Sequence, residues 1–125
     1  MLSDEEFKPG QQRLLSVDNP LFVPEGTKIK FLVTANDVMH SFFVPSLAVQ
    51  TYAIIGRVDE VWIDVPKGEK TYYGQCNQIC GVNHSFMPIV VKALVEDEYR
   101  AWLEDAKQEF AILETPELIQ LAAVK

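Results

Sequence analysis

One short segment, from Cys76 to Met87, constrains the fold of this chain more than any other feature. It contains two thiols, an imidazole and a thioether, supplied by Cys76, Cys80, His84 and Met87. The chain has two cysteines and two histidines in all, and the other histidine, His40, lies far upstream. A fold that uses both imidazoles in one site must therefore bring two distant parts of the chain together.

The side-chain chemistry of this segment favours copper. Thiolate and thioether ligands select copper or iron–sulfur chemistry, imidazole suits copper and zinc, and zinc sites rarely use thioether. A mononuclear blue-copper site needs one Cys, two His and a weak axial Met, which leaves the second thiolate unused. Two coppers that share two bridging thiolates would use it. Each metal would then take one imidazole, with Met87 and the backbone carbonyl of Gln78 in the weak axial positions.

Each ligand also has an ordinary structural explanation. The cysteines could form a disulfide or be buried free thiols, and Met87 beside Pro88 could belong to the core. For a single residue that explanation is the commoner one. The joint pattern favours a metal, because a disulfide leaves both His40 and His84 without a role.

On these residues the chain resembles the copper-binding domain of subunit II of the haem-copper cytochrome c oxidases, which carries the dinuclear CuA centre. The family pattern Cys-x3-Cys-x3-His-x2-Met, preceded by Gly-Gln and followed by Pro, is matched from Gly74 to Pro88. The similarity covers roughly residues 8–103. It includes four further segments, 13–19, 37–41, 44–46 and 56–57.

The resemblance implies a ligand set for the two coppers. The implied ligands are His40, Cys76, Cys80, His84, Met87 and the main-chain carbonyl of Gln78. The family usually has Glu at position 78, where the side chain also ligates magnesium at the contact with the catalytic subunit. The neutral amide of Gln78 is a weaker ligand for a hard cation, which counts against that magnesium site.

The resemblance also implies a function. The domain would accept electrons from cytochrome c at the dinuclear copper centre and pass them to haem in the catalytic subunit I. It would do no bond chemistry itself and would act as a component of an oxidoreductase complex, with Arg57 and the Gln78 loop near subunit I. It is expected at the intermembrane-space face of the mitochondrial inner membrane, or at the periplasmic face of a bacterial plasma membrane, attached through partner subunits.

The net charge of the chain indicates which kind of partner it would bind. A net charge of −7 and a pI near 4.7 favour a basic redox partner over nucleic acid, whose phosphates would be repelled. By the resemblance, Asp18 and Asp37 match family carboxylates that help dock cytochrome c. Tyr52 replaces another such carboxylate, and Phe42 stands where the family commonly has Trp.

The remaining sequence predicts an all-β domain with a helical tail. With 125 residues and 48% hydrophobic content, the chain supports one compact domain. Short alternating segments between Pro and Gly predict a sandwich or Greek-key barrel, and the resemblance implies that it is cupredoxin-like. We expect residues 1–95 to form the dinuclear copper domain and residues 96–125 the C-terminal helical tail. The expected strands are 21–23, 28–34, 40–44, 53–55, 60–65, 71–74 and 89–95.

In the tail, residues 96–110 predict an amphipathic helix with an acidic first turn. Apolar side chains at i, i+3 and i+4 spacing would pack on the core; they are Tyr99, Trp102, Leu103, Ala106 and Phe110. Thr115 before Pro116 predicts the start of a second short helix that runs to Ala123.

No segment approaches the ~20 consecutive apolar residues of a membrane span. In the family, subunit II begins with two transmembrane helices and an aromatic strand. We expect these parts to come from a separate chain, as in a subunit II divided between two polypeptides. Truncation and proteolytic maturation are the alternatives.

Three rival functions share parts of the pattern. The dinuclear copper domain of nitrous oxide reductase has the same ligand spacing, but the Gly-Gln and Met-Pro flanks argue against it. A copper chaperone would hold one Cu(I) with a Cys pair and a distant His, which makes His84 and Met87 superfluous. A thiol-disulfide module expects a Cys pair at a helix N-terminus, which the strand signals around Cys76 oppose.

Overall fold

The computed structural model describes residues 12–68 and 70–110, with only the backbone of Phe110. This part of the chain contains seven strands, two 3-10 turns and one α-helix. The strands are β1 (Leu21–Pro24), β2 (Lys28–Val33), β3 (His40–Val44), β4 (Val49–Ala53), β5 (Asp59–Asp64), β6 (Lys70–Gln75) and β7 (Pro88–Leu94). The 3-10 turns are η1 (Pro45–Leu47) and η2 (His84–Phe86), and the helix is α1 (Glu96–Phe110).

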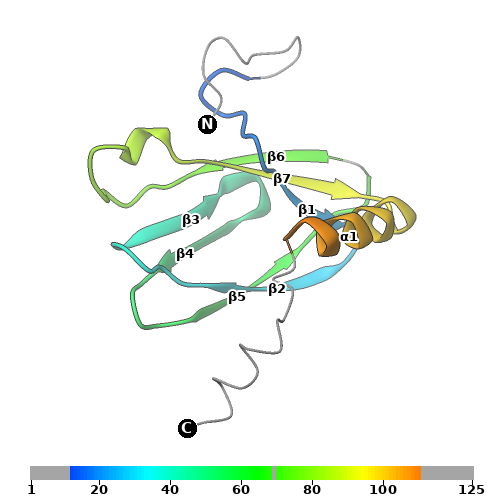
Figure 1. Ribbon diagram of the computed structural model, residues 1–125, viewed down its shortest axis with the longest axis horizontal. Coiled ribbons are helices and arrows are strands. Elements are labelled where there is room, and N and C mark those ends of the chain that lie inside the picture. Colours follow the sequence, from blue (N-terminus) through cyan, green and yellow to red (C-terminus); the bar gives the residue numbers. More distant parts are fainter. Residues whose placement is uncertain (1–11, 69, 111–125) are drawn as a thin grey trace, which may run out of the picture.

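The strands form three small sheets, ordered β1-β7-β6, β2-β5 and β3-β4. β1 runs parallel to β7, and the other neighbours are antiparallel. Figure 1 shows β6 and β7 along one side of the molecule, β2 and β5 along the other, and β3 and β4 between them. The expected all-β fold with a C-terminal helix is confirmed.

A single apolar core joins the three sheets. Its most buried side chains are Val44, Ile63 and Val91, one from each sheet. Other members of the cluster are Val23, Val49, Val65, Tyr72 and Ala93. Each sheet buries one face in this cluster. No single sheet could bury that apolar face without the other two.

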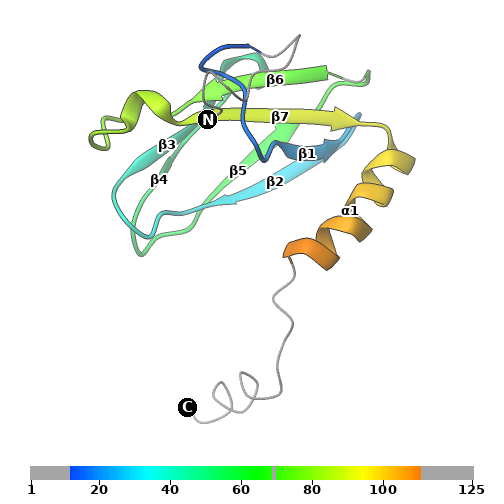
Figure 2. The same ribbon diagram turned by 45° about the horizontal axis from the view of Figure 1, so that its top comes forward.

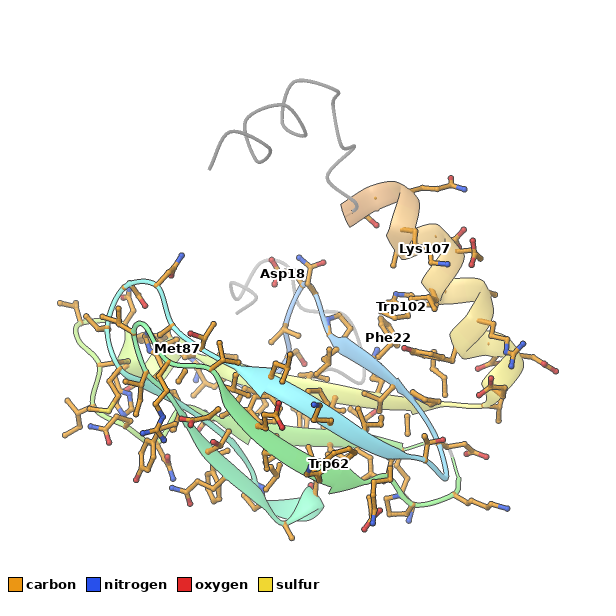
Figure 3. The ribbon with its side chains drawn as sticks, turned by 90° about the horizontal axis from the view of Figure 1, so that it is seen from below. Asp18, Phe22, Trp62, Met87, Trp102 and Lys107 are labelled. Carbon is orange, nitrogen blue, oxygen red and sulfur yellow. The ribbon has the colours of Figure 1, made fainter. Side chains whose placement is uncertain are left out.

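The β2-β5 pair shows how alternation separates core from solvent. Outward positions carry the ion pairs Lys28–Asp64, with 3.6 Å between charged atoms, and Lys30–Glu60, with 3.1 Å. Trp62 lies on the same outward face, where the Lys30 ammonium sits 5.8 Å from its ring centre (Figure 3). The inward positions of both strands supply core residues, as period-two alternation predicts.

Helix α1 packs beside β1 through aromatic side chains. The ring centre of Trp102 lies 5.0 Å from that of Phe22 and 5.7 Å from that of Tyr99. Figures 2 and 3 show the helix leaving the end of β7 and turning alongside β1, with Phe22 and Trp102 facing each other. The expected packing face is half-buried at Tyr99, Trp102, Leu103 and Ala106. The side chain of Phe110 lies outside the described residues.

One expected strand is wrong in its bounds. The strand predicted at 53–55 is instead β4, at Val49–Ala53, because β4 forms a ladder with β3 from Val44 opposite Val49 to His40 opposite Ala53. The chain then turns, with the Arg57 amide donating to the Ile54 carbonyl over 3.3 Å. The second helix expected at 115–123 lies outside the described residues.

The architecture separates two ends of the molecule. The loop between β6 and β7 lies at the opposite end from α1 (Figure 1). β7 ends at Leu94 and α1 begins at Glu96, on either side of the expected boundary between copper domain and tail. In the described ranges, no helix is long and apolar enough to span a bilayer.

Candidate metal centre

Three parts of the chain meet at the loop end of the sheets. His40 is the first residue of β3, Cys76 directly follows β6, and the loop returns to β7 at Pro88. The base of the loop is closed, because the Cys76 amide donates to the Met87 carbonyl over 3.2 Å. Figure 3 shows Met87 at this end of the molecule, remote from Trp102 on α1.

The donor atoms of the loop converge. Cys76 Sγ lies 3.9 Å from Cys80 Sγ and 3.2 Å from the carbonyl oxygen of Gln78. Cys80 Sγ lies 3.5 Å from His84 Nδ1 and 3.5 Å from Met87 Sδ. The loop therefore gathers five of the six expected ligands around its two sulfurs.

His40 completes the cluster from the sheet side. Its ligand nitrogen and the sulfurs of Cys76 and Cys80 all lie within 4.8 Å of one another. Nε2 is 2.8 Å from Asp37 Oδ1, whereas the buried Nδ1 has no hydrogen-bond partner among the described residues. A carboxylate on one ring nitrogen fixes the proton there and leaves the lone pair of the other for a metal.

Asp37 and His40 also shift each other's protonation. The hydrogen bond to Asp37 raises the pKa of His40, although burial of the ring opposes this. A backbone hydrogen bond at Val38, followed by the bond to His40, lowers the pKa of Asp37. The carboxylate is therefore ionised under ordinary conditions and orients the ring.

The two cysteines are free thiols in different environments. Their sulfurs are 3.9 Å apart, well beyond the ~2.05 Å of a disulfide bond. Burial opposes ionisation of Cys76, but backbone hydrogen bonds at Ser41 and Gln78 outweigh it and lower the pKa of Cys76 to about 6. Burial, and then the neighbouring Cys76, raise the pKa of Cys80. The pair therefore offers one ready thiolate, the metal-binding form of the group.

A tight turn brings the end of the loop back to Cys80. Gly81 has φ of +140°, a conformation open mainly to glycine. The amide of His84 then donates to the Gly81 carbonyl over 3.1 Å, and the amide of Phe86 donates to the Asn83 carbonyl over 2.9 Å. The turn places His84 and the residue after Phe86 on the same side as the thiols.

The donor set fits copper. It comprises two thiols, two imidazoles, a thioether and a carbonyl, and soft sulfur with imidazole is a copper combination. The unpartnered Nδ1 of His40 is an independent indication, because buried polar atoms are rarely left without a partner. That these six residues bind copper stays a prediction.

The aromatic residues near the site divide between core and surface. Phe42 packs against the core cluster, with its ring centre 5.6 Å from that of Phe31. Phe86 is 52% exposed. Phe42 therefore serves the core, whereas Phe86 lies largely at the surface.

The two carboxylates expected to dock a partner lie in different places. Asp37 is exposed beside His40, at the edge of the site. Asp18 lies in the loop before β1, where it accepts a hydrogen bond from the Asn19 amide over 3.1 Å. Figure 3 shows it apart from Met87. Only Asp37 is adjacent to the ligand cluster.

Two residues next to the ligands were not expected to have a role. Ser41 and Asn77 follow His40 and Cys76, and their polar groups bond to each other. Ser41 was part of the recognised His40 strand, so its position was visible in the sequence. Its partner was not, because the pairing joins segments far apart in the chain.

Comparison with known proteins gives consistent results. A sequence model of the family described as cytochrome c oxidase subunit II, periplasmic domain, matches residues 1–94. The probable cytochrome c oxidase subunit 2 of Rickettsia bellii is 48% identical over 103 residues, which cover 82% of this chain and 38% of the relative. Cytochrome c oxidase subunit 2 of Arabidopsis thaliana is 47% identical over 105 residues, 84% of this chain and 40% of the relative. The chain thus spans about two fifths of the length of these relatives.

Solved structures support the same assignment. The crystal structure of the periplasmic domain of cytochrome oxidase subunit II (CoxB) of Bradyrhizobium japonicum matches with a TM-score of 0.77 and 42% identity, covering 81% of this chain and 72% of that one. A mixed-disulfide intermediate between a thioredoxin-like protein and subunit II matches with a TM-score of 0.69 and 41% identity, covering 78% and 73%. The expected cupredoxin-like fold is confirmed. The chain belongs to the cytochrome c oxidase subunit II family and corresponds to its periplasmic domain.

Proposed function

We propose that this chain is the electron-transfer domain of a haem-copper cytochrome c oxidase. It accepts electrons from cytochrome c at a dinuclear copper centre formed by His40, Cys76, Gln78, Cys80, His84 and Met87, and passes them to haem in the catalytic subunit I. The observation that carries this proposal is the convergence of these six donors at one end of the sheets. Two bound copper ions would supply a one-electron redox centre there.

The chain's own contribution is a ligand set with little freedom to rearrange. His40 and Cys76 are attached to strands, and the loop is closed at its base by the Cys76–Met87 backbone hydrogen bond. Asp37 holds the His40 ring through Nε2, so the ring presents Nδ1 to the thiols. Ligands held in one geometry suit electron transfer, because the site needs no large movement when its charge changes.

The rim of the site supports contact with redox partners. Ile79 and Val82 on the ligand loop are 84% and 99% exposed, and Phe86 is half exposed. Exposed apolar side chains beside the donors suit a surface for contact with another protein. We assign this rim to close approach of the electron donor or of subunit I, and we expect Arg57, on the β4–β5 turn, near subunit I as well.

Electrostatics supports a basic donor. The net charge is −7, and Asp37 presents an exposed carboxylate beside the site. Complementary charge mainly speeds encounter and sets orientation, and its effect declines with salt. Asp18 would contribute from further away. Gln78 supplies a neutral side chain, so we propose no strong magnesium site at this position.

The family match supports a proposal for the location of the domain. The matching family model is that of a periplasmic domain. We propose that this domain lies at the periplasmic face of a bacterial plasma membrane or the intermembrane-space face of the mitochondrial inner membrane. The copper chaperone and nitrous oxide reductase alternatives are not retained, because the sequence matches are to subunit II.

One matching structure also favours a redox reaction of the two thiols before copper binds. One matching structure is a mixed disulfide between a thioredoxin-like protein and subunit II. In this chain Cys76 and Cys80 are close enough to form a disulfide after a small movement. We propose that a dithiol reductase restores the thiols before copper enters. Its thiolate attacks one sulfur, the mixed disulfide is resolved by its second thiol, and the chain gains two thiols while the reductase becomes a disulfide.

Reduction by cytochrome c tests the main proposal. We expect the copper-loaded chain to be reduced rapidly by ferrous cytochrome c in stopped-flow absorbance, with a rate that falls as salt rises. Asp37→Lys and Asp18→Lys should each slow this reduction at low salt, by about tenfold for the closer Asp37. Asp105→Lys, an exposed charge reversal on α1, is the matched control and should leave the rate unchanged.

The outcomes separate two claims. A wild-type chain that carries copper and is not reduced by cytochrome c would remove cytochrome c as the donor. Normal reduction of both aspartate variants, with an unchanged salt slope, would remove these carboxylates from the docking surface alone.

A further inference from the structure

The two halves of the ligand cluster belong to different sheets. His40 begins β3 in the β3-β4 sheet, whereas Cys76 follows β6 in the β1-β7-β6 sheet. Among the residues that the structure describes, no backbone ladder joins β3 to β6. The distance between these two ligands therefore depends on contacts between the sheets other than ladder hydrogen bonds.

Ser41 and Asn77 provide such a contact. The Asn77 amide donates to Ser41 Oγ over 2.7 Å, and the Ser41 hydroxyl donates to Asn77 Oδ1 over 2.5 Å. Ser41 is 4% exposed and directly follows His40, while Asn77 directly follows Cys76. This reciprocal pair thus ties the immediate neighbours of two ligands, one from each sheet.

The hydroxyl also lies 3.9 Å from Cys76 Sγ, a long contact beside its 2.5 Å bond to Asn77 Oδ1. Because a hydroxyl has a single proton, the shorter bond to Asn77 is the stronger one. The same pairing engages the Asn77 backbone amide, which is thereby directed at Ser41. Ser41 therefore acts on the site through the path of the backbone at Cys76.

A second contact between the same strands lies just before Cys76. A Cβ built on Gly74 would lie 2.1 Å from the Phe43 carbonyl oxygen and 2.8 Å from Val44 Cγ2. β6 therefore approaches the backbone of β3 as closely as glycine permits. With β6 already pressed against β3 at Gly74, the Ser41–Asn77 pair fixes the direction in which the chain leaves toward the ligand loop.

We propose that Ser41 and Asn77 are positioning residues, which set the placement of Cys76 relative to His40 and thereby the affinity and electronic structure of the copper site. This inference rests on the proposed copper function. Groups that orient metal ligands without touching the metal commonly contribute about 10–100-fold to metal affinity. A reciprocal bond between two sheets gives this pair such a role.

The test compares copper affinity and the electron paramagnetic resonance spectrum across four variants of the full chain. Ser41→Ala removes both hydrogen bonds with Asn77, and Asn77→Ala removes the acceptor on an exposed side chain. Ser41→Thr keeps the hydroxyl. Ser16→Ala is the matched control, because Ser16 is equally buried and its Oγ accepts the Gln12 amide over 2.9 Å in a turn that carries no ligand.

We expect Ser41→Ala to lower the copper affinity, measured in competition with a chelator, by about 10–100-fold. We also expect it to change the hyperfine splitting in the electron paramagnetic resonance spectrum. Asn77→Ala should show a smaller change of the same kind, since its backbone amide remains. Ser41→Thr should keep the wild-type copper affinity and the wild-type spectrum. Ser16→Ala should lower the melting temperature and leave copper affinity and spectrum as in the wild type.

Several results would overturn the proposal. Ser41→Ala with wild-type affinity and spectrum would show that the pair only satisfies buried polar groups, as Ser16 does. Equal losses in Ser41→Thr and Ser41→Ala would assign the effect to volume rather than to the hydroxyl. If Ser41→Ala does not fold, Asn77→Ala decides, and wild-type behaviour there refutes the role. A wild-type chain that fails to bind copper would instead refute the proposed function.

Discussion

The sheet side and the loop side of the ligand cluster are built differently. On the sheet side, His40 and Cys76 adjoin strands, Ser41 beneath them is buried, and β6 presses on β3 at Gly74. On the loop side, the backbone runs through exposed residues such as Val82 to His84. The donors there are positioned by a glycine turn and by one another.

This difference suggests a division of labour. The sheets fix part of the coordination geometry before metal arrives, because their positions are set by the core. The loop supplies the remaining donors and the exposed rim, and its arrangement around Cys80 depends on the sulfur contacts of His84 and Met87. Substitutions on the sheet side should therefore alter both the stability of the fold and copper binding. Substitutions on the loop side should alter copper binding alone.

The largest effect should come from the thiol on the sheet side. Cys76→Ser should abolish the dinuclear signal, because this sulfur lies against Cys80, Gln78 and His40 at once. Cys80→Ser should also lose the shared electron but keep a single copper on His40 and Cys76. Copper analysis and electron paramagnetic resonance distinguish these outcomes. A signal shared over two coppers in Cys76→Ser would contradict the central place given to this thiol.

The next effect tests the close approach of β6 to β3. Gly74→Ala should lower the free energy of unfolding by about 3 kcal/mol, because the new methyl meets the Phe43 carbonyl. Gly56→Ala is the control: its φ is +71°, yet an added methyl meets nothing within 4 Å, so a cost of about 1 kcal/mol is expected. Urea denaturation measures both. Equal losses would show that the strands can separate at Gly74 without penalty.

The pH response should separate the two thiols. In the copper-free chain, thiolate absorbance should rise in two steps. The first has a midpoint at about pH 6, where Cys76 loses its proton, and the second lies above the usual thiol value, where burial and the existing charge on Cys76 delay Cys80. Cys80→Ser should remove the upper step and keep the lower one. A single step near the ordinary thiol pKa would refute the difference in environment.

The smallest effect concerns a polar atom inside the core. Tyr72 is buried, and its hydroxyl has no hydrogen-bond partner among the described residues. Tyr72→Phe should therefore change the free energy of unfolding by less than about 1 kcal/mol, toward greater stability, since a buried group without a partner gains nothing from remaining polar. Thermal unfolding measures it. A clear loss of stability would reveal a partner for this hydroxyl.

Local sequence patterns predicted much of this architecture. Alternation predicted β2 and β5, the apolar spacing predicted α1 from Glu96 to Phe110, and one short segment contained most of the donors. β4 was misplaced because its bounds depend on pairing with β3 rather than on its own residues. The Ser41–Asn77 contact was out of reach for a similar reason. A serine and an asparagine far apart in the chain form no pattern until two sheets pack together.

Copper analysis combined with electron paramagnetic resonance on the copper-loaded chain tests the central claim most directly. Two coppers per chain, with hyperfine structure from one electron shared over both nuclei, is the result that the six converging donors predict. One copper with a localised signal, or a silent Cu(I), would contradict a dinuclear electron-transfer centre and would indicate a mononuclear site or a copper carrier instead.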